Sequence, residues 1–145
     1  MATPPSLNGP TGRYVARRLA DLYDAWSLTE GGWPRLEHGR VRSFCDYYRA
    51  YPQLLESAIA EKPEPSGWPA FDSLIAGLAE TLADDAGTPR PAWTVTVEPD
   101  TATWRRHSAV LEGEWRATTP APILDRGLII DAASLWHTWP IYEPA

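Results

Sequence analysis

The chain has 145 residues and a mass of 16.1 kDa, which is the size of one domain. It is 43% hydrophobic and 22% charged, a balance typical of chains that fold and not of disordered ones. No apolar run approaches the ~20 residues that cross a bilayer, and residues 1–10 lack the basic and apolar regions of a signal peptide. We therefore expect a cytoplasmic protein without membrane contact.

Charge and cysteine usage exclude several classes of site. The net charge is −6, and nucleic-acid affinity depends on Lys and Arg that neutralise phosphates, so we do not expect this chain to bind nucleic acid on its own. Arg13, Arg17 and Arg18 are the candidate phosphate contacts, although nearby acidic residues favour internal ion pairs. A single cysteine, Cys45, excludes an internal disulfide and a thiolate metal cage. Lys62 is the only lysine.

In chain order, residues 1–12 are rich in Pro and Gly and are predicted to form a flexible leader. Residues 13–145 are predicted to form one helical domain with a Trp-rich C-terminal tail. Apolar residues recur at helical spacing over residues 13–26, which predicts an amphipathic helix. A second helical pattern covers residues 41–48, and a third, short helix is expected to begin at Pro52, because proline is tolerated in a first turn.

The most regular pattern lies over residues 69–86, where one apolar stripe predicts a helix that ends at Gly87. Residues 93–98 alternate Thr with Val, as in a half-buried strand. Residues 128–130 form the other strand-like run. The sequence therefore predicts that these two runs pair.

Two further helices are predicted, over residues 101–116 and from an N-cap at Asp131 to His137. The expected fold class is mainly α, a single compact helical domain of five or six helices with at most a short two-stranded β element. The predicted core comprises Leu19, Leu22, Phe44, Tyr48, Leu55, Leu74, Ile75, Leu78, Trp93 and Ile129.

No residue pattern indicates catalysis or a cofactor. Asp131, Ser134 and His137 are suitable types for nucleophilic catalysis, but all three lie on one short predicted helix, whereas catalytic triads draw on distant segments. His38, His107 and His137 lack the spacing of zinc ligands, and no glycine-rich phosphate loop follows a strand. We predict no enzyme, no metal and no cofactor; a small enzyme of unrecognised type is the remaining alternative.

Eight tryptophans are more than a core of this size easily hides, and exposed Trp is a common binding hot spot. Trp104 and Trp115 are eleven residues apart, close to three helical turns, so one helix would place them on one face. Trp136, Trp139 and Tyr142 gather near the C-terminal end. Whether each aromatic face packs inside the domain or against a partner is open at this point.

Four segments of the chain resemble uncharacterised actinobacterial proteins that carry an N-terminal helix-turn-helix and are similar to antitoxins or regulators. The matching segments are residues 41–48 (VRSFCDYY), 54–61, 68–94 (ending in PRPAWT) and 121–133. In the last segment, Arg126 and Asp131 match. Residues before Val41 predict one helix only, so the DNA-reading helices of that family are not expected here.

The resemblance implies a non-enzymatic protein-interaction module, antitoxin-like, that neutralises or regulates a protein partner such as a toxin, or that pairs with a second copy of itself. A DNA-associated transcriptional regulator that uses the N-terminal arginines is the alternative. The predicted partner-binding residues are Trp104, Trp115, Arg126, Trp136, Trp139 and Tyr142.

Deleting residues 139–145 should abolish complex formation and leave the helical circular dichroism and thermal unfolding of the remaining chain nearly unchanged. The reason is that Pro140 prevents a helix from continuing, so the tail is expected to lie extended along a partner's groove. Unfolding of the truncated monomer would instead identify the tail as core.

Overall fold

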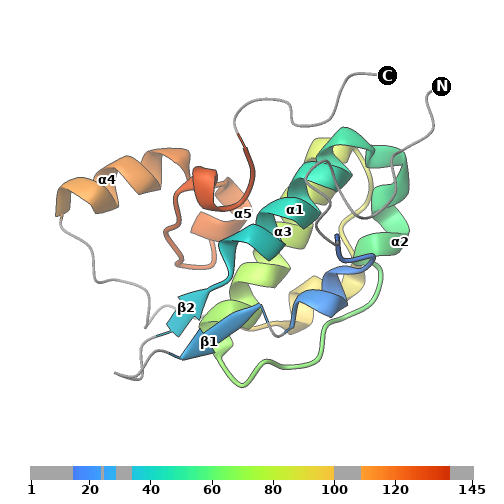
Figure 1. Cartoon of the computed structure of the whole chain (residues 1–145), viewed down its shortest axis with the longest axis horizontal. Coiled ribbons are helices and arrows are strands. Elements are labelled where there is room, and N and C mark those ends of the chain that lie inside the picture. Colours follow the sequence, from blue (N-terminus) through green and yellow to red (C-terminus); the bar gives the residue numbers. More distant parts are fainter. Residues whose placement is uncertain (1–14, 24, 29–33, 100–108, 138–145) are drawn as a thin grey trace.

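The other elements pack around the 18-residue helix α3 (Pro69–Ala86), which runs through the middle of the computed structural model (Figure 1). The structure describes residues 15–23, 25–28, 34–99 and 109–137. Within α3, residues 70, 71 and 73–83 are all buried, as expected of a helix covered on several sides. The described chain is a mainly helical single domain with five α-helices, as the sequence predicts.

The predicted bounds of α3 are confirmed at both ends. Trp68 is extended and precedes Pro69, which occupies the first helical position, where its missing N–H is not needed. Gly87 has φ +71° and donates its backbone N–H to the Ala83 and Asp84 carbonyls. A left-handed residue at this place favours glycine, so sequence chemistry alone ends the helix.

The prediction of one helix over residues 13–26 is wrong, because the described residues of this segment do not form an α-helix. Leu19–Leu22 forms a single 3-10 turn, η1, and the chain then enters strand β1 (Trp26–Leu28). Strand β1 pairs antiparallel with β2 (Pro34–Leu36), and the Glu37 N–H donates to the Ala25 carbonyl at 2.8 Å. The buried Leu19 and Leu22 are three residues apart, a spacing that fits a 3-10 turn as well as an α-helix.

Helix α1 (His38–Ala50) contains the predicted segment 41–48, and η2 (Pro52–Leu54) followed by α2 (Leu55–Ile59) is the short helix predicted at Pro52. Tyr48 of α1 lies 4.7 Å from Phe44 between ring centroids, and its hydroxyl donates to the Arg17 carbonyl at 2.8 Å. The aromatic face of α1 therefore holds the segment before η1 against the core.

The predicted pairing of residues 93–98 with residues 128–130 is also wrong. Ala92–Thr96 forms the 3-10 helix η3, residues 128–130 have no strand partner, and β1–β2 is the one sheet among the described residues. The Thr94 hydroxyl donates to the Pro91 carbonyl at 3.0 Å and the Thr96 hydroxyl to the Trp93 carbonyl at 2.6 Å. Threonine side chains thus bond their own backbone and stabilise a turn in place of a strand.

The C-terminal part contributes α4 (Ala109–Thr118), α5 (Ala121–Leu124) and the 3-10 turn η4 (Ala132–Ser134). Helix α4 includes the last residues of the predicted helix 101–116, whose beginning lies outside the described residues. The Asp131 carboxylate accepts the Ala133 N–H at 3.2 Å, so the predicted N-cap is confirmed, although it caps a single turn. Nine of the ten predicted core residues are buried. The tenth, Trp93, is half-buried and packs against the core.

Helices α3 and α5 approach each other at Gly77. A Cβ built on Gly77 would lie only 3.0 Å from Cγ1 of Ile123 and 3.2 Å from Cδ of Arg126. A side chain here would push α5 away, so glycine at this position allows the close contact.

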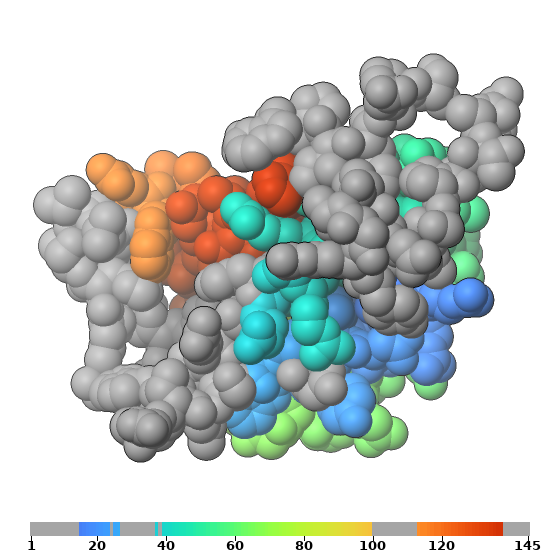
Figure 2. Space-filling model, viewed as in Figure 1, coloured from blue at the N-terminus to red at the C-terminus, as the bar shows by residue number. Residues whose placement is uncertain are grey.

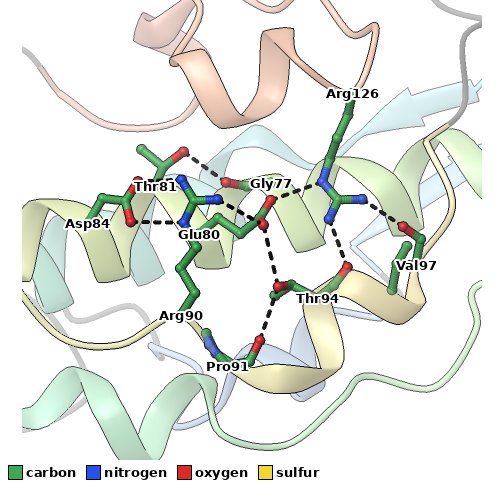
Figure 3. A network of polar contacts seen from close by, with 9 residues as sticks. All are labelled: Gly77, Glu80, Thr81, Asp84, Arg90, Pro91, Thr94, Val97 and Arg126. Atoms are coloured by element: carbon green, nitrogen blue, oxygen red, sulfur yellow. Dashed lines mark hydrogen bonds and ion pairs between the residues drawn. The ribbon is translucent and has the colours of Figure 1, made fainter.

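A buried polar network joins α3, η3 and the turn after α5 (Figure 3). The Arg126 guanidinium donates to Glu80 at 3.1 Å, to the Thr94 carbonyl at 2.8 Å and to the Val97 carbonyl at 2.9 Å. Arg126 and Glu80 are both buried. Because a buried charge is stable only when it is paired and hydrogen-bonded, these contacts fix η3 against α3.

Arg90 extends the network towards the surface. Its guanidinium lies 3.3 Å from Glu80 and 2.7 Å from Asp84. The hydrogen bonds from Arg90 hold the pKa of Asp84 below its ordinary value. The Asp84–Arg90 pair is exposed to solvent, so we expect it to stabilise the fold less than the buried pair does.

Replacing Arg126 with Met should lower the free energy of unfolding by about 3–5 kcal/mol, because it leaves the Glu80 carboxylate buried beside fewer donors. Urea denaturation of the purified chain measures this loss. The double variant Arg126→Met/Glu80→Met should recover part of it, since neither buried charge remains. A single-variant loss below about 1 kcal/mol would contradict the role given to the pair.

Candidate functional site

A cleft of about 180 Å³ opens beside the first turns of α3. Its walls come from three separate parts of the chain, namely the end of η1, the loop over residues 62–65, and η3. Figure 2 shows the η1 segment in blue above green atoms of the middle of the chain, on the face viewed. The lining residues are Tyr23, Lys62, Pro63, Glu64, Pro65, Phe71, Asp72, Ile75, Trp93, Thr96 and Val97.

The floor of the cleft is apolar and well supported. Phe71 and Ile75 belong to α3 and are buried in the core. Trp93 donates its indole N–H to the Ile59 carbonyl at 2.9 Å, so the polar atom of this half-buried ring already has a partner inside the chain. The Trp93 ring therefore forms an apolar wall that needs no polar partner in the cleft.

The loop wall is fixed from both sides. The Ser66 N–H donates to the Asp72 carboxylate at 3.0 Å, and the Ser66 hydroxyl accepts the Trp68 N–H at 3.1 Å. On the other side, the Lys62 ammonium donates to the Thr96 hydroxyl at 2.9 Å and so links the loop to η3. Prolines in the loop further limit its backbone freedom. We expect this wall to stay in place when the cleft is filled.

One of the exposed apolar side chains lines the cleft. Three large apolar residues of the described chain are exposed, namely Tyr23 at 49%, Leu54 at 38% and Val95 at 83%. Tyr23 lines the cleft, and Val95 neighbours the lining residue Thr96. Leu54 lies on η2 and is not part of the lining. An apolar cleft with an exposed aromatic side chain in its lining is a surface suited to contact with another molecule.

Three charged side chains line the cleft, namely Lys62, Glu64 and Asp72. Close to it, Arg18 pairs with Asp21 at 2.9 Å and with Glu61. The hydrogen bond from Arg18 to Asp21 is the main cause that raises the pKa of this guanidinium. Lys62, by contrast, has no carboxylate within ion-pair distance among the residues that the structure describes.

Arg126 is not available to a partner. All three of its guanidinium nitrogens donate within the chain, to Glu80, Thr94 and Val97, and the side chain is buried. The prediction that Arg126 contacts a partner is therefore corrected, because its charge stabilises the fold.

The predicted partner-binding tryptophans are only partly described. Trp115 on α4 is half-buried. Trp136 is half-buried, packs against the core, and has the Arg49 guanidinium 4.3 Å from its ring centroid. The structure does not place either ring in the cleft. Trp104, Trp139 and Tyr142 lie outside the described residues, as does Arg13.

The structure describes two of the three candidate phosphate contacts. Arg17 and Arg18 are both exposed. Arg18 pairs with two carboxylates, which confirms the preference for internal ion pairs at this residue. We infer that Arg18 offers less positive charge to phosphates than the sequence alone would suggest.

His137 pairs with a residue that the sequence did not indicate. Its Nδ1 lies 2.6 Å from the Asp46 carboxylate, and its backbone N–H donates to the same carboxylate at 2.9 Å. Asp131 caps η4, as described above, and makes no contact with His137 that would orient the ring. Arg42 donates to the Ala133 carbonyl at 2.7 Å. Residues 132–137 are therefore held along α1, and the triad considered from sequence does not form.

Other reactive or membrane-spanning features are not present in the described parts of the chain. Cys45 is buried, and desolvation raises the pKa of its thiol, which disfavours the nucleophilic thiolate. Residues 15–23, 25–28, 34–99 and 109–137 contain no cluster of three potential metal ligands. In the same residues, no helix combines the length and the apolar character needed to cross a bilayer.

Sequence reasoning missed the cleft. No motif marks residues 61–67 as part of a site, and the Thr–Val alternation at residues 93–98 predicts a strand. A usable signal was the sole lysine, Lys62, which precedes two segments that each carry a Trp near a Pro, at Trp68 and Trp93. Comparison of the chain with protein-family models, curated protein sequences and solved structures gives no match.

Replacing Asp46 with Ala should release residues 132–137 from α1. The loss of two hydrogen bonds to a carboxylate should lower the free energy of unfolding by about 1–3 kcal/mol, and amide hydrogen exchange at His137 should speed up. The control is Asp131→Ala, which removes the cap of η4 at a cost of about 1 kcal/mol and leaves the His137–Asp46 contacts in place. Unchanged exchange at His137 in Asp46→Ala would contradict this account.

Proposed function

We propose that this chain is a non-enzymatic protein-interaction module, antitoxin-like, whose cleft beside η3 takes up one apolar side chain of a protein partner. The observation that carries the proposal is a small apolar cleft whose lining includes the exposed Tyr23, together with the highly exposed Val95 on η3, the segment that forms one wall. The resemblance of residues 41–48 and 68–94 to antitoxin-like and regulator-like proteins supports the same class of function.

The size of the cleft favours a side chain over a larger ligand. Small-molecule pockets usually enclose about 300–1,000 Å³, whereas an apolar cavity of about 150 Å³ is enough for benzene. At about 180 Å³, this cleft suits one aromatic ring or one branched aliphatic chain. A partner that inserts a single such anchor, and covers the surrounding surface, would match a typical interface hot spot.

The hydrogen bonds that hold the walls of the cleft in place also favour binding. The hydrogen bonds of Ser66, Lys62 and Trp93 hold the loop and η3 in place before any partner arrives. A preformed cleft loses little conformational entropy on association, so more of the burial energy contributes to affinity. A partner that buries Val95 as well would gain roughly 25 cal/mol for each Å² of apolar surface removed from water.

Charge distribution makes the DNA-associated alternative the weaker proposal. The net charge is −6, and Arg18 is already paired with Asp21 and Glu61. Binding that falls steeply with salt concentration would favour that alternative. An interface built on one apolar anchor should respond much less to salt.

The test uses this chain, expressed in its native cells with a photo-crosslinking amino acid at position 95. We expect one discrete adduct with a protein that also co-purifies in a fixed ratio. The variant Val95→Asp should weaken that complex at least about tenfold, because a charge in an apolar contact must be desolvated. Affinity is measured by titration of the purified partner.

The matched control is Leu54, the exposed apolar residue that lies outside the cleft. A crosslinker at position 54 should give no such adduct, and Leu54→Asp should leave the affinity unchanged. Circular dichroism confirms that both variants fold. Equal adducts at positions 54 and 95, or an unchanged affinity in Val95→Asp, would reject the cleft as the binding surface.

A further inference from the structure

Lys62 differs from the other cations that hold the domain together. Arg18, Arg90 and Arg126 each pair with at least one carboxylate. The Lys62 ammonium instead donates to the neutral hydroxyl of Thr96 at 2.9 Å. An ammonium has three donors, and this bond uses one of them. Lys62 therefore places a positive charge at the wall of an apolar cleft, with donors left for a ligand.

The position of this charge is defined and not diffuse. The Thr96 hydroxyl that holds the Lys62 ammonium also donates to the Trp93 carbonyl at 2.6 Å. Lys62, Thr96 and Trp93 all line the cleft. A group that enters between the Trp93 ring and the loop thus meets an apolar wall and an ammonium within one small space.

The acidic lining residues limit how much negative charge a ligand can carry. Asp72 already accepts the Ser66 N–H at 3.0 Å, and Glu64 is exposed beside Pro63 and Pro65. With one cation and two carboxylates in the lining, a ligand with several negative charges would be repelled. Lys62 is the one cation among the lining residues, so a single carboxylate that contacts its ammonium directly is the anionic group that this lining can hold.

From this arrangement we infer that the cleft recognises the C-terminal residue of a protein partner, with its apolar side chain in the cleft and its terminal carboxylate on Lys62. A C-terminal residue carries its carboxylate on the same Cα as its side chain, so both groups reach one small site together. A residue inside a chain has a neutral amide at that place. Capture of a chain end is a known mode of peptide recognition, and the inference rests on the proposed function.

The test compares two peptides that differ only at the chain end. Ac-Gly-Ser-Gly-Ser-Phe as the free acid and as the C-terminal amide are titrated into the full ¹⁵N-labelled chain and followed by NMR. The free acid should bind at least about tenfold more tightly, because a hydrogen bond between charged groups is stronger than one to a neutral amide. Shifts should centre on residues 62–65 and 93–97.

Variants at one residue assign the effect to the ammonium. Lys62→Met keeps the aliphatic stem and should reduce the acid-to-amide ratio to about one, whereas Lys62→Arg should retain most of it. The matched control is Arg17→Met, which removes an exposed cation that does not line the cleft and should leave the ratio unchanged. The same peptide with Ser in place of Phe should not bind.

The outcomes separate this inference from the function it rests on. Equal binding of acid and amide, with shifts still in the cleft, would overturn the role of Lys62 and leave the apolar anchor intact. Failure of both Phe peptides to shift cleft residues would overturn the chain-end inference, and crosslinking at position 95 would then decide the function separately. If 3-phenylpropionate binds as tightly as the acid peptide, the occupant is a free acid and the chain-end assignment is wrong.

Discussion

The Arg126–Glu80 ion pair is the contact on which the rest of the site depends. Through the carbonyls of Thr94 and Val97, Arg126 holds the middle and the C-terminal end of the η3 region, and through Glu80 it attaches them to α3. Residues of η3 form one wall of the cleft, while α3 forms the floor. A buried guanidinium between them therefore sets the width of the cleft, although it never touches the space inside.

The walls are stabilised by interactions of different physical kinds. The floor is part of the apolar core, the Trp93 wall is oriented by one hydrogen bond to Ile59, and the loop wall is held by Lys62 and Ser66. Exposed hydrogen bonds contribute less than buried ones. The loop wall is therefore held less strongly than the floor and the η3 wall, but its hydrogen bonds on both sides keep it in place.

The C-terminal segment is attached separately. Residues 132–137 contact α1 through Arg42 and Asp46, and Trp136 stacks with Arg49. The lining of the cleft includes none of these residues. Residues 132–137 and the cleft are therefore two separate features of the surface, and a partner that uses one has no structural need to disturb the other.

Local chemistry in the sequence determined the mainly helical class, the bounds of α3 at Pro69 and Gly87, and the cap at Asp131, because these depend on the backbone preferences of single residues. Burial of the predicted apolar stripe also followed from its spacing. The turn at η3, the inward position of Arg126 and the cleft were decided only in the tertiary structure. Each depends on partners far away in the chain, such as Glu80 for Arg126. A local sequence pattern does not indicate which distant residue supplies the compensating charge or forms the opposite wall of the cleft.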